Sequence, residues 1–177
     1  MTKQTVMIAL GGNSLSPKGS SGSVGEQFAS TRKTMDYLSK FIALDYNICI
    51  THGNGPQVGN ELLRMDLTND KVPPLPLGIC VANTQGQIGY MVQQTLQNKL
   101  REIDVDREVV TLVTQVLVNE NDPSIINPTK YIGPRYSKSD IDEIASKLGW
   151  KIKEQEPGLW RRVVPSPMPE YLSLIHI

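Results

Sequence analysis

The sequence has 177 residues, a length that is typical of one ordinary domain. Its 18 basic and 18 acidic residues balance, so no overall charge favours nucleic acid or an anionic membrane as a partner. The apolar run in residues 1–10 is too short for a signal peptide or a membrane span, so we expect a cytoplasmic protein with a local functional site.

The two cysteines, Cys49 and Cys80, have neither the spacing of a disulfide framework nor the close pairing of a zinc site. Both lie in apolar surroundings. We therefore expect two buried thiols in a reducing compartment.

The first third of the chain predicts a strand, a helix and a second strand. Residues 5–10 are almost continuously apolar and end at Gly11-Gly12, which is typical of a parallel strand buried on both faces. Apolar residues at gaps of three and four predict a helix over residues 28–42. A second strand is predicted over residues 47–51.

Further helices are expected after Gly53-Asn54-Gly55-Pro56 and after Thr84-Gln85-Gly86, with a proline-rich loop at residues 73–76 between them. A third strand is predicted over residues 109–118. This alternation predicts an α/β fold whose parallel sheet is covered by helices.

Residues 119–160 are more polar and resemble an insertion on the main sheet. Within them, Ser139 can cap a helix over residues 141–148 that ends at Gly149. Residues 150–153 alternate like an exposed strand.

Gly11-Gly12-Asn13 directly follows the first predicted strand, at the carboxyl edge where α/β sheets bind ligands. Glycines let backbone amides approach an anion closely, and Asn13 can add a side-chain donor. The alternative is a tight turn that needs only the flexibility of glycine.

Gly53 and Asn54 follow the second predicted strand in the same way, and Pro56 suits the first turn of a helix whose N-terminus would face an anion. We interpret His52 as a structural histidine bonded to nearby backbone, in preference to a general base.

The sequence contains neither the G-x-G-x-x-G dinucleotide fingerprint nor the G-x-x-x-x-G-K-[ST] phosphate loop. It also shows no cluster of carboxylates suited to magnesium, so no metal ligand is assigned. Lys130, inside Asn127-Pro128-Thr129-Lys130, is a separate basic residue that is either solvated or reaches an anion.

Five motifs follow one another along the chain: Ala9-Leu10-Gly11-Gly12-Asn13, His52-Gly53-Asn54-Gly55-Pro56-Gln57-Val58-Gly59, Thr84-Gln85-Gly86-Gln87-Ile88-Gly89-Tyr90, Asn127-Pro128-Thr129-Lys130-Tyr131-Ile132-Gly133-Pro134 and Trp160-Arg161-Arg162-Val163-Val164-Pro165-Ser166-Pro167. In sequence and in order they resemble the motifs of carbamate kinases, which are members of the amino acid kinase fold.

The resemblance implies a three-layer αβα sandwich with an inserted small subdomain, of which this chain covers a little over half. The implied parts are an N-terminal lobe over residues 1–118, a protruding subdomain over 119–160 and a return to the main domain over 161–171. Residues 172–177 resemble the translation of a transposon end used in sequencing libraries, so we expect a non-native tail there, and no role for His176.

The resemblance also implies reversible phosphoryl transfer from ATP to carbamate, giving ADP and carbamoyl phosphate with magnesium, in the arginine deiminase pathway. By this resemblance the carbamate and the moving phosphoryl group are held by Gly11, Gly12, Asn13, Gly53, Asn54 and Lys130. Of these, Lys130, Gly12 and Asn13 are the expected catalytic residues.

Most amino acid kinases are similar to one another in carrying a phosphate-binding lysine two residues before the Gly-Gly pair, where this chain has Ala9. By the resemblance, Lys130 takes the place of that lysine. The Thr84-Gln85-Gly86 and Trp160-Arg161-Arg162 motifs are expected to support helix packing and the subdomain hinge.

The resemblance places the ATP and magnesium sites in the missing half, so we expect the chain to be inactive and to bind no ATP by itself. A homodimer without nucleic acid or membrane partners is expected. The alternatives are another amino acid kinase acting on a carboxylate, and a non-catalytic fragment for carbamoyl phosphate binding or dimerisation.

Overall fold

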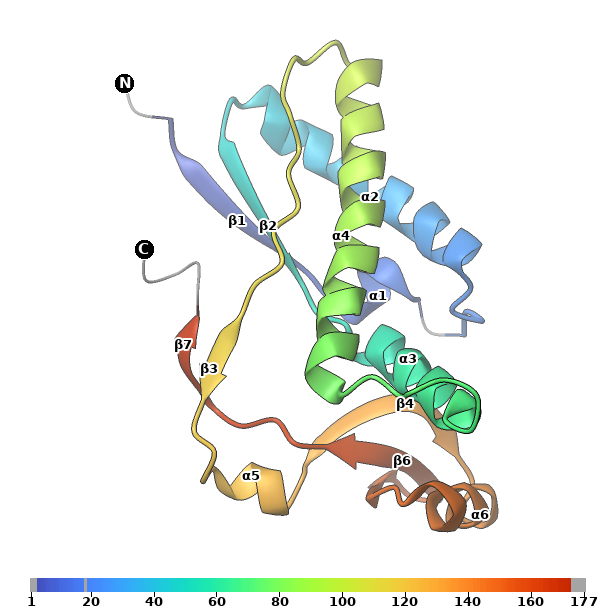
Figure 1. Ribbon diagram of the computed structural model, residues 1–177. Helices are drawn as coiled ribbons and strands as arrows, with labels where there is room; N and C mark the ends of the chain where they lie inside the picture. Colours follow the sequence, from blue (N-terminus) through green and yellow to red (C-terminus); the bar gives the residue numbers. More distant parts are fainter. Residues whose placement is uncertain (1–2, 18, 173–177) are drawn as a thin grey trace. The chain divides into compact units, whose positions relative to one another are not determined.

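The computed structural model describes residues 3–17 and 19–172, and of Asn13 only the backbone (Figure 1). The chain divides into two compact units. Unit 1 comprises Met1–Asn54 and Asn83–Leu112, and unit 2 comprises Gly55–Ala82 and Val113–Ile177. None of the described helices is long and apolar enough to cross a membrane.

The predicted parts, 1–118, 119–160 and 161–171, stay predictions. The two compact units have other boundaries, and one of these, between Ala82 and Asn83, lies inside a helix. Of the predicted tail, Leu172 is the last residue of strand β7, and residues 173–177 lie outside the described part of the chain.

Unit 1 is built on the parallel pair of β1 (Thr5–Leu10) and β2 (Asn47–His52), which lie side by side in Figure 1. Their register runs from Thr5↔Asn47 to Leu10↔His52, which confirms the predicted parallel pairing. Between them, after the short α1 (Gly12–Leu15), α2 (Val24–Ala43) starts at a capping box formed by Ser23 and Glu26.

The core of unit 1 lies between this strand pair, α2 and α4 (Leu77–Glu102). Its buried residues are Leu10, Leu15, Met35, Leu38, Ile42, Ile88, Met91, Val92, Leu96 and Leu100. The helix predicted over residues 28–42 is therefore confirmed, and its apolar stripe faces the sheet.

The prediction that the first strand is buried on both faces is wrong for the described residues. Met7 is 66% exposed, and its neighbour in the ladder, Cys49, is also exposed. The described helices cover one face of the strand pair, so alternate side chains point away from the core. The expected burial of Cys49 is wrong for the same reason.

The helix predicted after Thr84-Gln85-Gly86 begins earlier than expected, because α4 starts at Leu77 and this motif lies inside it. Glycine and threonine in this motif suggested a turn, but neither residue breaks a helix whose other positions favour it.

The strand predicted over residues 109–118 is wrong except for β3 (Val116–Val118). The Gln97 side chain of α4 instead holds the preceding segment, with Nε2 donating to the Arg107 carbonyl at 2.9 Å and Oε1 accepting from Val109 N at 3.0 Å. A side-chain amide thus satisfies backbone groups that a neighbouring strand would otherwise bind.

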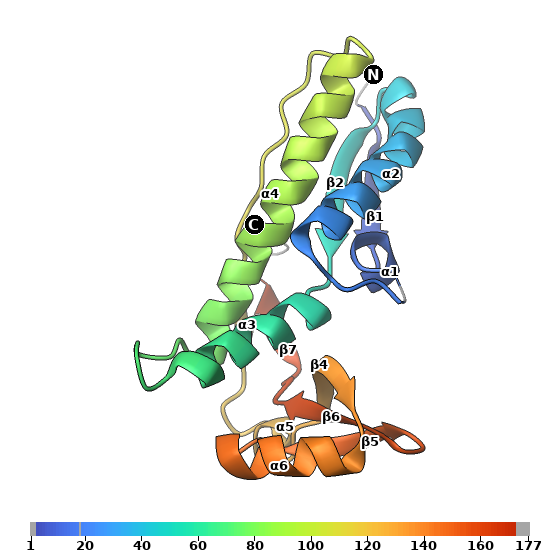
Figure 2. The ribbon, with the colours of Figure 1, turned by 90° about the vertical axis from the view of Figure 1, so that its right-hand side faces the viewer.

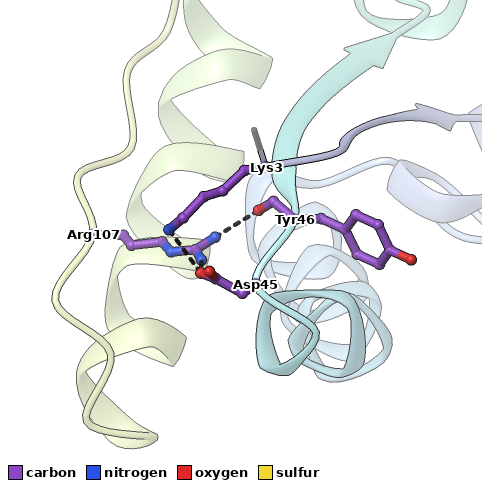
Figure 3. Close-up of polar contacts among 4 residues, drawn as sticks. All are labelled: Lys3, Asp45, Tyr46 and Arg107. Carbon is purple, nitrogen blue, oxygen red and sulfur yellow. Dashed lines mark hydrogen bonds and ion pairs between the residues drawn. The ribbon is translucent and has the colours of Figure 1, made fainter. Parts of the chain in front are cut away.

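A polar cluster closes the amino-terminal edge of the strand pair (Figure 3). Asp45 has a left-handed φ of 59° in the turn before β2, and its carboxylate binds Lys3 Nζ at 2.8 Å and also the Arg107 guanidinium. Arg107 Nη1 donates to the Tyr46 carbonyl at 2.7 Å. The hydrogen bond from Lys3 and the positive charges of Lys3 and Arg107 lower the pKa of Asp45.

Unit 2 contains α3 (Gly55–Thr68) and an antiparallel sheet of order β4-β6-β5, formed by Lys130–Tyr136, Leu159–Val164 and Ile152–Glu156. Figure 2 shows α6 (Lys138–Leu148) beside this sheet. Unit 2 also contains α5 (Pro123–Ile126), β3 paired with β7 (Pro169–Leu172), and the start of α4.

The helix predicted over residues 141–148 is confirmed as α6, but its cap is Ser137 in place of Ser139. The Ser137 hydroxyl accepts from Asp140 N at 3.2 Å, as an N-cap side chain does for an amide two or three residues later. Gly149 ends the helix at a φ of 65°, as predicted.

The core of unit 2 contains Val58, Leu62, Cys80, Ile132 and Val164. Cys80 is fully buried, as expected, and this burial raises the pKa of its thiol.

Candidate functional site

The two predicted anion loops lie at the same edge of unit 1. Because β1 and β2 are parallel and in register up to Leu10↔His52, Gly11 and Gly53 leave the sheet at adjacent strand ends. Gly11 is the N-cap of α1, with φ −71° and ψ 166°. Carboxyl ends of parallel strands are the usual ligand-binding edge of an α/β sheet. The structure thus brings together the backbones of Gly11, Gly12 and Asn13 with Gly53 and Asn54.

The glycines of these loops are not required by the described parts of the fold. None of Gly11, Gly12 and Gly53 has a positive φ. A Cβ built on any of them would meet no described atom within 4 Å. A turn that needed only glycine flexibility would use left-handed backbone or close packing. The geometry therefore favours the other interpretation, in which glycine keeps the backbone amides accessible.

The Asn54 side chain is held by a residue that sequence reasoning assigned to helix packing. Asn54 Nδ2 donates to Thr84 Oγ1 at 2.9 Å, across 30 positions of sequence. Thr84 is 1% exposed and lies inside α4. The only signal for this contact in the sequence was the presence of both residues in the family motifs. The predicted Asn13 side-chain donor lies outside the described atoms.

His52 is the last residue of β2, and its Nδ1 lies 3.3 Å from the Gly53 carbonyl oxygen. Among the described residues this backbone group is its only hydrogen-bond partner. The contact agrees with the structural interpretation of His52, since no acid or nucleophile of the described residues is bonded to the ring.

Lys130 belongs to unit 2, where it is the first residue of β4 and pairs with Val164. Its side chain is exposed, and in the described part of the chain no ion pair or hydrogen bond holds its ammonium group. Pro128, two residues earlier, is buried and fixes the start of the strand. Convergence of Lys130 with the glycine loops of unit 1 stays a prediction.

The strand that begins at Lys130 is packed against α3 through a backbone contact. A Cβ on Gly59 would lie 2.1 Å from Gly133 N and 2.2 Å from Gly133 Cα. Gly133 itself has a φ of 70°. Arg161 Nη2 donates to the Gly133 carbonyl at 2.6 Å, and burial lowers the pKa of this guanidinium. These contacts fix β4 on α3 within unit 2.

A second contact joins α3 to the sheet of unit 2 through one carboxylate oxygen. Asp66 Oδ2 accepts from Trp150 Nε1 and from Arg162 Nη1, each at 2.7 Å. The Arg162 guanidinium lies over the Trp150 ring, 4.7 Å from its centroid. The Trp160-Arg161-Arg162 motif thus has a packing role, with both arginines bonded inside unit 2.

No group of three or more histidine, cysteine, aspartate or glutamate side chains in residues 3–17 and 19–172 is arranged to hold a metal ion. The candidate site residues of unit 1 are glycines and asparagines, which offer amide donors. This donor set suits an anion and would not hold magnesium by itself.

No model of a protein family matches the chain. Among curated proteins, it is 45% identical over 169 residues to a carbamate kinase of Pyrococcus horikoshii, covering 94% of this chain and 54% of that protein. The chain spans about half the length of the curated relatives it matches.

Solved structures give the same result. The carbamate kinase from Giardia lamblia bound to citric acid matches with a TM-score of 0.91 at 33% identity, over 97% of this chain and 55% of that chain. The same enzyme bound to AMP-PNP matches with a TM-score of 0.80 at 34% identity, over 97% of this chain and 54% of that chain.

The parallel strand pair with glycine loops after both strands, together with these matches, defines an α/β protein of the amino acid kinase fold. More particularly, nearly the whole chain is similar to about half of each carbamate kinase that it matches.

Proposed function

We propose that this chain is the carbamate-binding part of an enzyme that catalyses reversible phosphoryl transfer between ATP and carbamate, giving ADP and carbamoyl phosphate. The observation that carries the proposal is the pair of glycine loops at one sheet edge, whose glycines the described fold does not require. The homology to carbamate kinases supports the choice of substrate.

The chain's own residues would act by position and charge. The amides of Gly11, Gly12 and Gly53 and the Asn54 side chain would donate to carbamate and to the oxygens of the moving phosphoryl group. Lys130 would add a positive charge there. It would replace the phosphate-binding lysine that other amino acid kinases carry at the position that Ala9 occupies in this chain. Donors fixed before the reaction stabilise the charge of the transferring group without reorganisation.

ATP, ADP and magnesium would be held by parts of the protein that this chain does not include. The binding of AMP-PNP is a property of the Giardia lamblia enzyme as a whole, of which this chain matches 54%. Magnesium, when bound, would neutralise charge on the phosphates. We further propose a cytoplasmic homodimer of the arginine deiminase pathway, supported by the five family motifs.

The test uses an assembled enzyme, in which this chain up to Tyr171 is joined to the part of the Pyrococcus horikoshii carbamate kinase that it does not match. We expect ATP formation from ADP and carbamoyl phosphate. Lys130→Ala should lower kcat roughly 100- to 1000-fold, because one fixed donor to the transferring group is lost. Lys71→Ala, at an exposed lysine in a turn of unit 2, is the matched control and should retain parent activity.

Activity of Lys130→Ala within twofold of the parent would contradict the role of Lys130. ATP formation only from another acyl phosphate would favour a different amino acid kinase. Binding of carbamoyl phosphate without any turnover would favour the non-catalytic alternative.

A further inference from the structure

We propose that Thr84 is a positioning residue of the phosphoryl-transfer site, which orients the Asn54 amide through the hydrogen bond between Asn54 Nδ2 and Thr84 Oγ1. The inference rests on the proposed function, because it deepens the role of Asn54 in that site. Thr84 touches no substrate in this assignment and acts only through Asn54.

The location of Thr84 makes it a rigid support. It lies within the 26-residue helix α4, and its side chain is 1% exposed. Ile88, one turn further along, is completely buried in the core of unit 1. A threonine side chain has few χ1 rotamers in a helix, so its hydroxyl oxygen is restricted to few positions.

The orientation of Asn54, by contrast, is not fixed by its own backbone. Asn54 lies beyond the end of β2, in the turn before α3, and it is only half-buried. Rotation of an asparagine amide about χ2 is broad, so an unsupported amide would sample many directions. The 2.9 Å contact to Thr84 uses one Nδ2 hydrogen and defines where the other hydrogen and Oδ1 point.

Two other buried threonines of unit 1 show the usual behaviour of such a hydroxyl. Thr95 Oγ1 donates to the Met91 carbonyl and Thr31 Oγ1 donates to the Gln27 carbonyl, each at 2.7 Å and within its own helix. Thr84 differs because its hydroxyl oxygen accepts a hydrogen bond from a residue of the strand-end loop. The contact therefore couples the helix to the site and is not a general consequence of threonine burial.

The test compares Thr84→Val, Thr84→Ser and Thr95→Val in the assembled enzyme. Thr84→Val should lower kcat roughly 10- to 100-fold, because a misdirected donor costs this much when reacting groups are held in place. Thr84→Ser should restore kcat to within about threefold of the parent, since the hydroxyl returns. Thr95→Val removes another buried hydroxyl of the same helix and should leave kcat unchanged.

A double-mutant cycle distinguishes positioning from packing. In an Asn54→Ala background, Thr84→Val should cause no further loss of kcat, because the group that Thr84 orients is already absent. Equal losses in both backgrounds would overturn the proposal. So would a lowered melting temperature for Thr84→Val with kinetic constants like those of the parent.

Failure of the proposed function gives a different result. If Lys130→Ala retains activity while Thr84→Val loses activity and Thr84→Ser restores it, the role of Lys130 is contradicted and that of Thr84 is supported.

If the assembled enzyme has no turnover, the Asn54 side-chain amide is followed by ¹⁵N NMR in the chain by itself while carbamoyl phosphate is added. Perturbation of this signal in the parent and Thr84→Ser, but not in Thr84→Val, would support the proposal. Identical responses in all three would overturn it.

Discussion

The glycines of the strand-end loops and two helical glycines, Gly59 and Gly89, occupy opposite environments. A Cβ on Gly12 or Gly53 would meet no described atom within 4 Å, whereas a Cβ on Gly59 would lie 2.1 Å from Gly133 N. On α4, a Cβ at Gly89 would lie 2.1 Å from Thr111 Cγ2. Glycine at Gly59 and Gly89 lets two segments pack closely, so the fold itself explains those residues.

The loop glycines have no such explanation within the described residues, and their backbone is not left-handed. Glycine therefore has two different roles in this chain, close packing at Gly59 and Gly89 and access to backbone amides in the loops. Substitution should separate the two groups, because a packing glycine affects stability and a site glycine affects turnover.

The largest effect is expected at Gly59. Gly59→Ala would force the added methyl group into the backbone of β4, and we expect a loss of at least about 3 kcal/mol in the free energy of unfolding. Gly78→Ala is the matched control, because Gly78 is also helical in unit 2 but its Cβ position is open. Alanine there should be neutral or stabilise by up to about 1 kcal/mol.

Chemical unfolding of the chain by itself measures both variants, with hydrogen exchange in α3 as the local readout. A loss below about 1 kcal/mol for Gly59→Ala would show that α3 and β4 are not in backbone contact.

A smaller effect, on activity alone, is expected at Gly12. Gly12→Ala in the assembled enzyme should lower kcat/KM for carbamoyl phosphate roughly 10- to 100-fold, because the methyl group would occupy the space through which the substrate approaches the amides. Its melting temperature should not fall, since the fold leaves that space open. Gly25→Ala, at an open position of α2, controls for the change of residue.

Parent-like kinetics with a clear drop in the melting temperature of Gly12→Ala would reverse this conclusion. Gly12 would then resemble Gly59, and the loop would be a turn that needs glycine for its own conformation.

The smallest effect is expected at the amino-terminal edge of the same strands, where Asp45 binds Lys3 and Arg107. The pKa of Asp45 is lowered from its ordinary value of 3.8, so the stability from these pairs is present above that value and is lost as the pH falls through the lower folded value. Asp45→Asn should therefore lower the melting temperature slightly at neutral pH and not at about pH 2.

Asparagine tolerates the left-handed backbone of Asp45, so the charge is the main change. Added salt should reduce the difference at neutral pH, because these side chains are exposed. A difference that persists at the acidic end would show that packing and not charge is responsible.

The sequence by itself determined the parallel strand pair, α2 and the cap at Gly149, because apolar periodicity and glycine chemistry act locally. It also identified the loops at Gly11 and Gly53 and the resemblance to carbamate kinases. The sequence could not determine which face of the strand pair α2 and α4 leave exposed. An apolar run predicts that a strand is buried, but it does not indicate which elements cover the strand.

Only the tertiary structure decided the contacts between residues far apart in sequence. The Gln97 side chain bonds to the Arg107 carbonyl and to Val109 N, where the strand predicted over residues 109–118 was expected to begin. The hydrogen bond from Asn54 to Thr84 and the contact of Gly59 with Gly133 join helices to loops and strands. Such contacts depend on the three-dimensional path of the chain, so the local pattern of residues carries no signal for them.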